Sequence, residues 1–89
     1  GINFDLLLLG VTSYSPETGF TCGVEDEARL KQTVLRRSEQ KVVLMDSSKI
    51  GLKSTFHICD LPEVDIIISD GKLPAEFLQA CQTAGVTVL

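Results

Sequence analysis

A charged and hydroxyl-rich turn follows a short apolar segment in the middle of this chain. Residues Lys41–Met45 include four consecutive apolar side chains, two of them β-branched, and this pattern predicts a strand buried on both faces of a parallel sheet. The next residues are Asp46-Ser47-Ser48-Lys49. Ligands of open α/β sheets bind beyond the carboxyl ends of the strands, where a lysine and hydroxyls can bind an anion such as a phosphate. A turn with a solvated lysine explains the same residues, so this segment alone leaves both interpretations open.

The end of the first predicted strand, Asp5–Leu9, offers a second part of such a site. Gly10, Val11 and Thr12 follow this strand directly. A glycine lets the backbone approach a ligand closely, and the following amides and hydroxyl could hold a phosphate or a sugar hydroxyl. A simple turn glycine explains the sequence equally well, so these three residues are candidates only in combination with others.

Two further charged residues could complete an anion site. Asp46 could orient Lys49, hydrogen-bond a sugar hydroxyl or cap the turn that follows it. Lys31 lies four residues after Glu27 in a predicted helix. It either forms a weak surface ion pair with Glu27 or joins Lys49 beside the anion, and the local sequence by itself favours the surface pair.

Five short strands and two helices are expected to position these residues. The strands are rich in Val, Ile and Leu and comprise Asp5–Leu9, Lys41–Met45, Thr55–Ile58, Val64–Ser69 and Val86–Leu89. The order strand–helix–strand, repeated, is typical of parallel βαβ units and predicts an α/β fold with a mainly parallel sheet and flanking helices. Segments 11–24 and 50–54 are expected to be loops.

Both helices carry recognisable terminal signals. Residues 25–37 begin with three acidic side chains and end with two arginines, which suits the helix dipole. Residues 74–84 begin with a proline and are followed by a glycine suited to the C-cap. The expected inward faces are Ala28, Leu30 or Lys31, Val34 and Leu35 in the first helix, and Phe77, Leu78 and Cys81 in the second.

Composition and charge exclude several classes of function. The 89 residues suffice for one small domain, and the net charge of −4 lacks the basic footprint of a nucleic-acid or anionic-membrane binder. Three cysteines without a CxxC pair, together with a single histidine, argue against a zinc site or a disulfide scaffold. Neither the P-loop nor the GxGxxG spacing is present. We therefore expect a soluble cytoplasmic protein with no metal, no cofactor and no membrane partner.

Several segments together resemble the C-terminal sensor domain of DeoR-type bacterial transcriptional regulators. The motif D-S-S-K-x-G is fairly specific, and the one departure from the common pattern is Ser69, where the family usually has threonine. The matching segments are Phe4–Gly10, Gly19–Thr21, Glu27–Lys31, Val42–Gly51 and Val64–Asp70. They cover nearly the whole chain.

The resemblance implies a fold similar to ribose-5-phosphate isomerase and a sensor for phosphorylated sugars or related metabolites. We expect residues 1–89 to be the C-terminal part of such a sensor, which reaches DNA only through an N-terminal helix-turn-helix absent from this chain. A homo-oligomeric repressor of carbohydrate metabolism is the expected whole protein. The expected effector-binding residues are Lys49, Lys31, Gly10, Val11, Thr12 and Asp46.

The same resemblance argues against an enzyme. The acidic loop of the isomerase aligns with residues 9–12, where Leu9 and Thr12 replace its carboxylates, and its catalytic glutamate falls on Lys31. Moving a proton between adjacent carbons needs a carboxylate base, whereas the phosphate-binding lysine persists as Lys49. We therefore predict binding without turnover. The alternatives are an isomerase-type enzyme and an oligomerisation module with a vestigial pocket.

Overall fold

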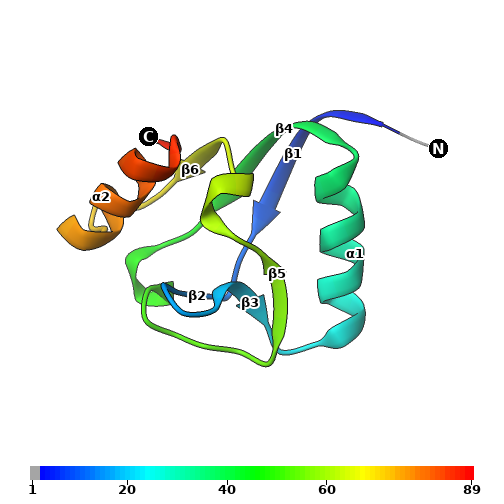
Figure 1. Ribbon diagram of the computed structural model, residues 1–89, viewed down its shortest axis with the longest axis horizontal. Coiled ribbons are helices and arrows are strands. Elements are labelled where there is room, and N and C mark those ends of the chain that lie inside the picture. Colours follow the sequence, from blue (N-terminus) through cyan, green and yellow to red (C-terminus); the bar gives the residue numbers. More distant parts are fainter. Residues whose placement is uncertain (1–2) are drawn as a thin grey trace.

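The computed structural model describes residues 3–89 as two sheets and two α-helices (Figure 1). The larger sheet is four-stranded and parallel, with the order β1-β4-β6-β7. Its strands are β1 (Phe4–Gly10), β4 (Ser38–Leu44), β6 (Ile66–Ile68) and β7 (Thr87–Val88). The predicted α/β fold with a parallel sheet and flanking helices is confirmed.

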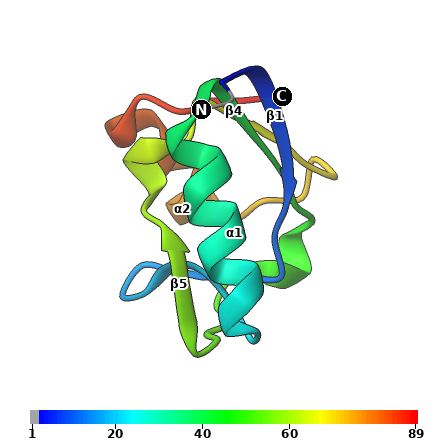
Figure 2. The same ribbon diagram turned by 90° about the vertical axis from the view of Figure 1, so that its right-hand side faces the viewer.

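The two helices lie where their terminal signals place them. Helix α1 spans Glu25–Arg36, and α2 spans Ala75–Ala84 with its C-cap Gly85 at a φ of 79°, a left-handed conformation that favours glycine. Figure 2 shows α1 between β1 and the smaller sheet.

The inward faces of the helices are narrower than predicted. In α1 the buried residues are Ala28 and Leu35, whereas Leu30 is 65% exposed, because two positions along a helix turn the side chain about 200° away from Ala28. In α2, Phe77 and Cys81 are buried on one face. Leu78 lies beside that face and is 42% exposed, so its predicted inward placement is wrong.

A second, antiparallel sheet occupies a segment that was expected to be a loop. Strands β2 (Ser13–Ser15), β3 (Gly19–Cys22) and β5 (Phe56–Cys59) form it in the order β2-β3-β5. The loop prediction for 11–24 is therefore wrong, because the hydroxyl side chains of the β2–β3 hairpin are buried against each other instead of facing water. Gly19 is required in the hairpin: its φ is 70°, and an added Cβ would lie 2.8 Å from the Cys59 carbonyl oxygen.

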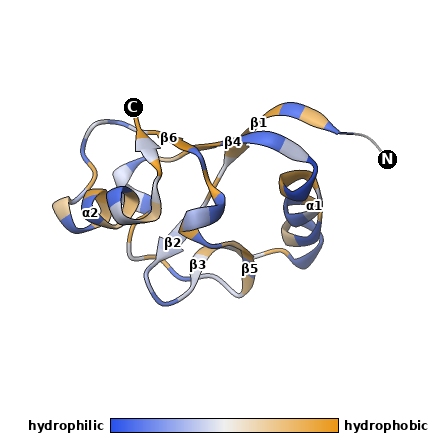
Figure 3. Cartoon of the chain, turned by 45° about the horizontal axis from the view of Figure 1, so that its top comes forward, coloured by the Kyte–Doolittle hydropathy of each residue, from blue (hydrophilic) through white to orange (hydrophobic). Residues whose placement is uncertain are grey.

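The hydrophobic core lies on one side of the parallel sheet. Figure 3 shows both helices and the smaller sheet on this side of β1, β4 and β6. Val43, Ile67 and Phe20 are fully buried there. The Tyr14 ring packs against Phe20 and, edge-on, against Phe77, with ring centroids 4.8 and 5.0 Å away.

The opposite side of the sheet, called the outer face below, is apolar and exposed. Leu6, Leu8, Leu44 and Ile68 point to it and are 52, 57, 41 and 40% exposed. The prediction that Lys41–Met45 is buried on both faces is confirmed for Val42 and Val43, which point to opposite faces and are 4 and 0% exposed, but it is wrong for Leu44. Each successive strand of the sheet is added on the same side of the previous one, in the order β1-β4-β6-β7. Because the crossovers between parallel strands are right-handed, all of these connections lie on one side of the sheet and leave the other side open.

Candidate functional site

The carboxyl ends of β1, β4 and β6 meet at one edge of the sheet. Gly10 is in register with Leu44, and Leu44 with Ile68. Two backbone hydrogen bonds continue this alignment past the strands: Val11 N donates to the Leu44 carbonyl at 3.4 Å, and Met45 N to the Ile68 carbonyl at 3.1 Å. The turns after the three strands are thereby held side by side, as the sequence predicted for the first two.

The turn after β4 is a single 3₁₀ turn, η1 (Ser47–Lys49), capped by Asp46. Asp46 Oδ1 accepts hydrogen bonds from the Ser48 hydroxyl and, at 2.9 Å, from Ser48 N. These two bonds, the hydroxyl first, hold the pKa of the Asp46 carboxyl below its ordinary value. Lys49 Nζ lies 3.9 Å from Asp46 Oδ2. The aspartate is thus a cap for the turn and a neighbour of the lysine ammonium.

Asp70, after β6, joins the same turn and was not among the predicted site residues. Its Oδ2 accepts from Ser47 N at 3.3 Å and from the Ser47 hydroxyl at 3.2 Å. Its pKa is lowered, first by the hydrogen bond from Lys72 N and also by those from Ser47. The sequence held a signal for this contact, since polar residues that end neighbouring parallel strands lie at one edge.

The turn after β1 is held from the other side by α1. Lys31 Nζ donates to the Gly10 carbonyl at 3.2 Å, and the Thr12 hydroxyl donates to the Thr21 carbonyl at 3.3 Å. The Val11 side chain is buried. A Cβ added to Gly10 would meet no atom within 4 Å, so space is open beside its backbone.

The predicted site residues therefore form two groups on one edge. Lys31 contacts the turn of Gly10, and Lys49 contacts Asp46. Within residues 3–89 no hydrogen bond or ion pair joins the two groups.

The β2–β3 hairpin connects the two groups mechanically. It begins at Ser13, directly after the Gly10–Thr12 turn, and it anchors the chain that follows Lys49. Gly51 N donates to the Tyr14 carbonyl at 2.7 Å. Thr21 Oγ1 lies 2.7 Å from Ser13 Oγ and accepts from Ser54 N at 3.0 Å. The hairpin fixes the η1 turn relative to the turn after β1.

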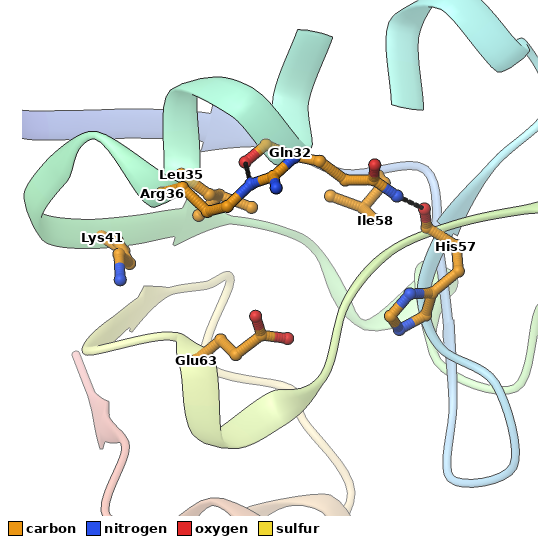
Figure 4. A pocket seen from close by; sticks show the side chains of 7 residues that line it. All are labelled: Gln32, Leu35, Arg36, Lys41, His57, Ile58 and Glu63. Atoms are coloured by element: carbon orange, nitrogen blue, oxygen red, sulfur yellow. Dashed lines mark hydrogen bonds between the residues drawn. The ribbon is translucent and has the colours of Figure 1, made fainter. Parts of the chain in front are cut away.

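A separate hollow of about 320 Å³ lies between α1, β4, β5 and the short turn η2 (Leu61–Glu63) (Figure 4). Arg36 and Lys41 line it together with Glu63, whose Oε2 already accepts from Asp60 N at 2.6 Å. Gln32 Nε2 donates across its rim to the His57 carbonyl at 2.7 Å. None of the predicted site residues lines this hollow, which is a second place where cationic side chains gather.

A wider groove of about 650 Å³ lies between the hairpin, η2 and α2. Its charged lining residues are Asp60 and Glu76, which repel anions. The groove is therefore unsuited to a phosphorylated ligand.

Other chemical features of the described chain are limited. Cys22, Cys59 and Cys81 are free and buried, and burial raises the pKa of the Cys59 thiol to about 12. Across residues 3–89, no trio of His, Cys, Asp or Glu side chains is arranged to hold a metal ion. None of the helices in that range has the length and apolar character needed to cross a membrane.

Comparison with known proteins decides the family. The sequence pattern of the "DeoR C terminal sensor domain" matches residues 1–71. This chain belongs to the DeoR sensor-domain family. The resemblance drawn from the D-S-S-K-x-G motif and its flanking strands is thereby confirmed.

Relatives of this DeoR sensor domain are regulators. The HTH-type transcriptional regulator GlpR of Haloferax volcanii is 40% identical over 87 residues, which are 98% of this chain and 34% of the relative. A putative aga operon transcriptional repressor of Escherichia coli O157:H7 is 39% identical over 98% of this chain and 32% of its own length. The HTH-type transcriptional repressor GlcR of Bacillus subtilis is 33% identical over 96% of the chain and 33% of its length.

Two facts follow from these relatives. The chain spans about one third of the length of each of them. These homologues are transcriptional regulators and not enzymes, in agreement with the expectation drawn from the missing carboxylates at Leu9, Thr12 and Lys31.

Proposed function

We propose that this DeoR sensor domain binds a phosphorylated sugar at the carboxyl edge of its parallel sheet, as part of a longer transcriptional regulator of carbohydrate metabolism. The observation that carries the proposal is the η1 turn, which presents Lys49 beside two serines at the end of the central strand β4. Two of the relatives are named as transcriptional repressors, which supports repression as the mode of regulation.

The proposed ligand contacts follow from the geometry of this edge. Lys49 provides the charge for the phosphate, and the open space beside Gly10 leaves room for the ligand. Asp46 and Asp70 are both ionised at neutral pH and hold η1 by hydrogen bonds, so they position the turn and can accept from sugar hydroxyls. Lys31 holds the Gly10 carbonyl and lies on the same edge. Binding would be read out through the arrangement of subunits in a homo-oligomer, which requires different affinities in two states.

Calorimetric titration with a panel of hexose and pentose phosphates tests this proposal. We expect at least one of them to bind, and the matching unphosphorylated sugar not to bind. Lys49→Ala should weaken binding at least about tenfold, because a charge-assisted hydrogen bond contributes roughly 1.5–3 kcal/mol. Lys49→Arg should retain much of the affinity.

The matched control is Lys41→Ala, which removes a cation from the hollow beside α1. It should leave the affinity unchanged. If Lys41→Ala abolishes binding and Lys49→Ala does not, the ligand site is the hollow. If no member of the panel binds to the longest available form of the protein, an oligomerisation module with a vestigial pocket is favoured.

A further inference from the structure

The hollow beside α1 is lined by a lysine that no side chain of residues 3–89 neutralises. Lys41 of β4 is in register with Leu7 and lies two positions before Val43, which places it on the covered side of the sheet. Among the described residues its ammonium has no ion pair and no hydrogen bond, and only its backbone N–H is engaged, by Asp65 Oδ2 at 2.8 Å. Lysines directed toward a core are normally paired. This lysine therefore lines the hollow as an uncompensated positive charge.

Arg36 provides a second cation from the last turn of α1. Its Nε donates to the Gln32 carbonyl at 3.4 Å, and its two terminal nitrogens have no partner in the part of the chain that the structure describes. An arginine and a lysine in the wall of one hollow can bind an anion through charge-assisted hydrogen bonds. The hollow therefore has the charge to hold an anionic group.

The other polar groups of the hollow are already held in place and keep free acceptors. Glu63 Oε2 accepts from Asp60 N at 2.6 Å, which leaves Oε1 available, and Figure 4 shows this carboxylate directed from η2 toward α1. Gln32 Nε2 donates to the His57 carbonyl at 2.7 Å, which leaves its amide oxygen available. The His57 and Asp60 side chains pair with each other at 3.0 Å. Two oxygens are thus free to accept from hydroxyl groups of a ligand.

Charge balance and size decide the class of anion. The hollow has one positive charge in excess, because its charged lining side chains are Arg36 and Lys41 against Glu63. A monocarboxylate neutralises this excess, whereas a phosphate monoester carries nearly two negative charges and is repelled by the glutamate. The volume of about 320 Å³ is at the lower end for ligand pockets. The buried side chains of Leu35 and Ile58 add an apolar wall for a short carbon chain.

We propose that this hollow is a second small-molecule site, which binds a compact hydroxy-monocarboxylate. The carboxylate of the ligand binds Arg36 and Lys41, and its hydroxyl groups donate to Glu63 Oε1 and to the amide oxygen of Gln32. The site is separate from the proposed phosphate site at Lys49 and does not depend on it.

Gluconate is the probe for this site, because it combines one carboxylate with hydroxyl groups along a short chain. Sorbitol has the hydroxyl groups without the charge, and hexanoate has the charge without the hydroxyl groups. In calorimetry of the longest available form of the protein, gluconate should bind with millimolar or tighter affinity, and both comparison compounds at least about tenfold more weakly. In NMR spectra, gluconate should shift the amide signals of Lys41 and Glu63 with saturation and leave those of Ser47–Lys49 in place.

Two substitutions test the cations separately. Lys41→Met removes the charge and keeps an aliphatic chain, and Arg36→Gln removes the charge at an exposed position. Each should weaken gluconate binding at least about tenfold. The matched control is Lys53→Ala, at an exposed lysine that pairs with Glu17 at 3.4 Å and does not line the hollow. It should leave the affinity unchanged. If Lys41→Met fails to fold, Arg36→Gln decides the outcome.

Several results would overturn the proposal. They are the absence of gluconate binding, equally tight binding of sorbitol or hexanoate, and a loss of affinity in Lys53→Ala as large as in the two hollow variants. Saturating gluconate shifts confined to Gly10–Thr12 and Ser47–Lys49 would also overturn it. The probe carries no phosphate and the variants keep Lys49, so failure of this test leaves the sugar-phosphate proposal standing.

Discussion

The inner and outer faces of the parallel sheet contain the same residue types on the same strands, and their surroundings are opposite. Leu9 is 7% exposed and its neighbour Leu8 is 57% exposed. On β6, Ile67 is fully buried and Ile68 is 40% exposed. The difference arises because all connections cross on one side. The apolar residue types of the strands are thus alike on the two faces, and the path of the chain determines which face residues 3–89 bury.

The largest effect is expected from a charge placed on the inner face of β1, and the same charge on its outer face is the comparison. Leu9→Asp should prevent cooperative folding, because an unpaired carboxylate in the core costs on the order of 5 kcal/mol, comparable to the total stability of a small domain. Leu8→Asp should cost no more than about 1 kcal/mol in the 89-residue chain. Urea unfolding followed by circular dichroism measures the free energy of unfolding of both variants. Equal damage from the two substitutions would contradict the assignment of the faces.

Truncation of two neighbouring isoleucines of β6, one on each face, should give a smaller difference in the free energy of unfolding. Ile67→Ala should lower the free energy of unfolding by about 3 kcal/mol, because the surrounding core cannot collapse into the space. Ile68→Ala should lower it by less than about 1 kcal/mol. The two substitutions delete the same atoms, so a difference under about 1 kcal/mol between their urea midpoints, converted to free energy, would refute the contrast.

Hydroxyl groups are also buried on the covered side of the sheet, and removing one of them should cause the next-largest loss of stability. Thr21→Val removes the hydroxyl that contacts Ser13 and accepts from Ser54 N, so it should cost about 1–3 kcal/mol. Thr21→Ser keeps the hydroxyl and should restore most of that loss. If Val and Ser at this position are equally stable, the hydroxyl network does not hold the hairpin.

The smallest expected effect concerns the exposed turn beside the sheet edge. Ser48→Ala should raise the pKa of the Asp46 carboxyl toward its ordinary value, since the Ser48 hydroxyl is the main cause of its lowering. Because the folded pKa lies below that of the unfolded chain, the ionised carboxylate stabilises the turn above the ordinary carboxylate range. This stabilisation is lost as pH falls through the folded pKa. A carbon-detected NMR titration measures the shift, and an unchanged midpoint would remove Ser48 as its cause.

Much of the fold could be predicted from the sequence because its elements follow local rules. The apolar runs of β1, β4 and β6, the acidic start of α1 and the Gly85 cap each correspond to an observed element. The β2–β3 hairpin could not be predicted from its composition, because its serines and threonines satisfy one another inside the fold. The exposure of Leu6 and Leu8 could not be predicted either, since it depends on the direction of the crossovers.

The candidate site was likewise predictable from the sequence only in part. The alignment of the Gly10 and Asp46 turns followed from parallel strands that end at one edge, and the structure places them there. Asp70 was missed because its contact with Ser47 spans 23 positions and depends on β6 lying next to β4. The hollow beside α1 is lined by Arg36 of α1 and Glu63 of η2, which are far apart in the sequence. No residue spacing in the sequence indicates that they lie around one hollow.

The most direct test of the proposed site is a residue-resolved NMR titration of the protein with the sugar phosphate that binds best in the calorimetric panel. We predict that the amide signals of Gly10–Thr12 and of Ser47–Lys49 shift with saturation, while those of Arg36 and Lys41 stay in place. Saturating shifts at Arg36 and Lys41, with unmoved signals at the sheet edge, would contradict the account and assign the ligand to the hollow beside α1.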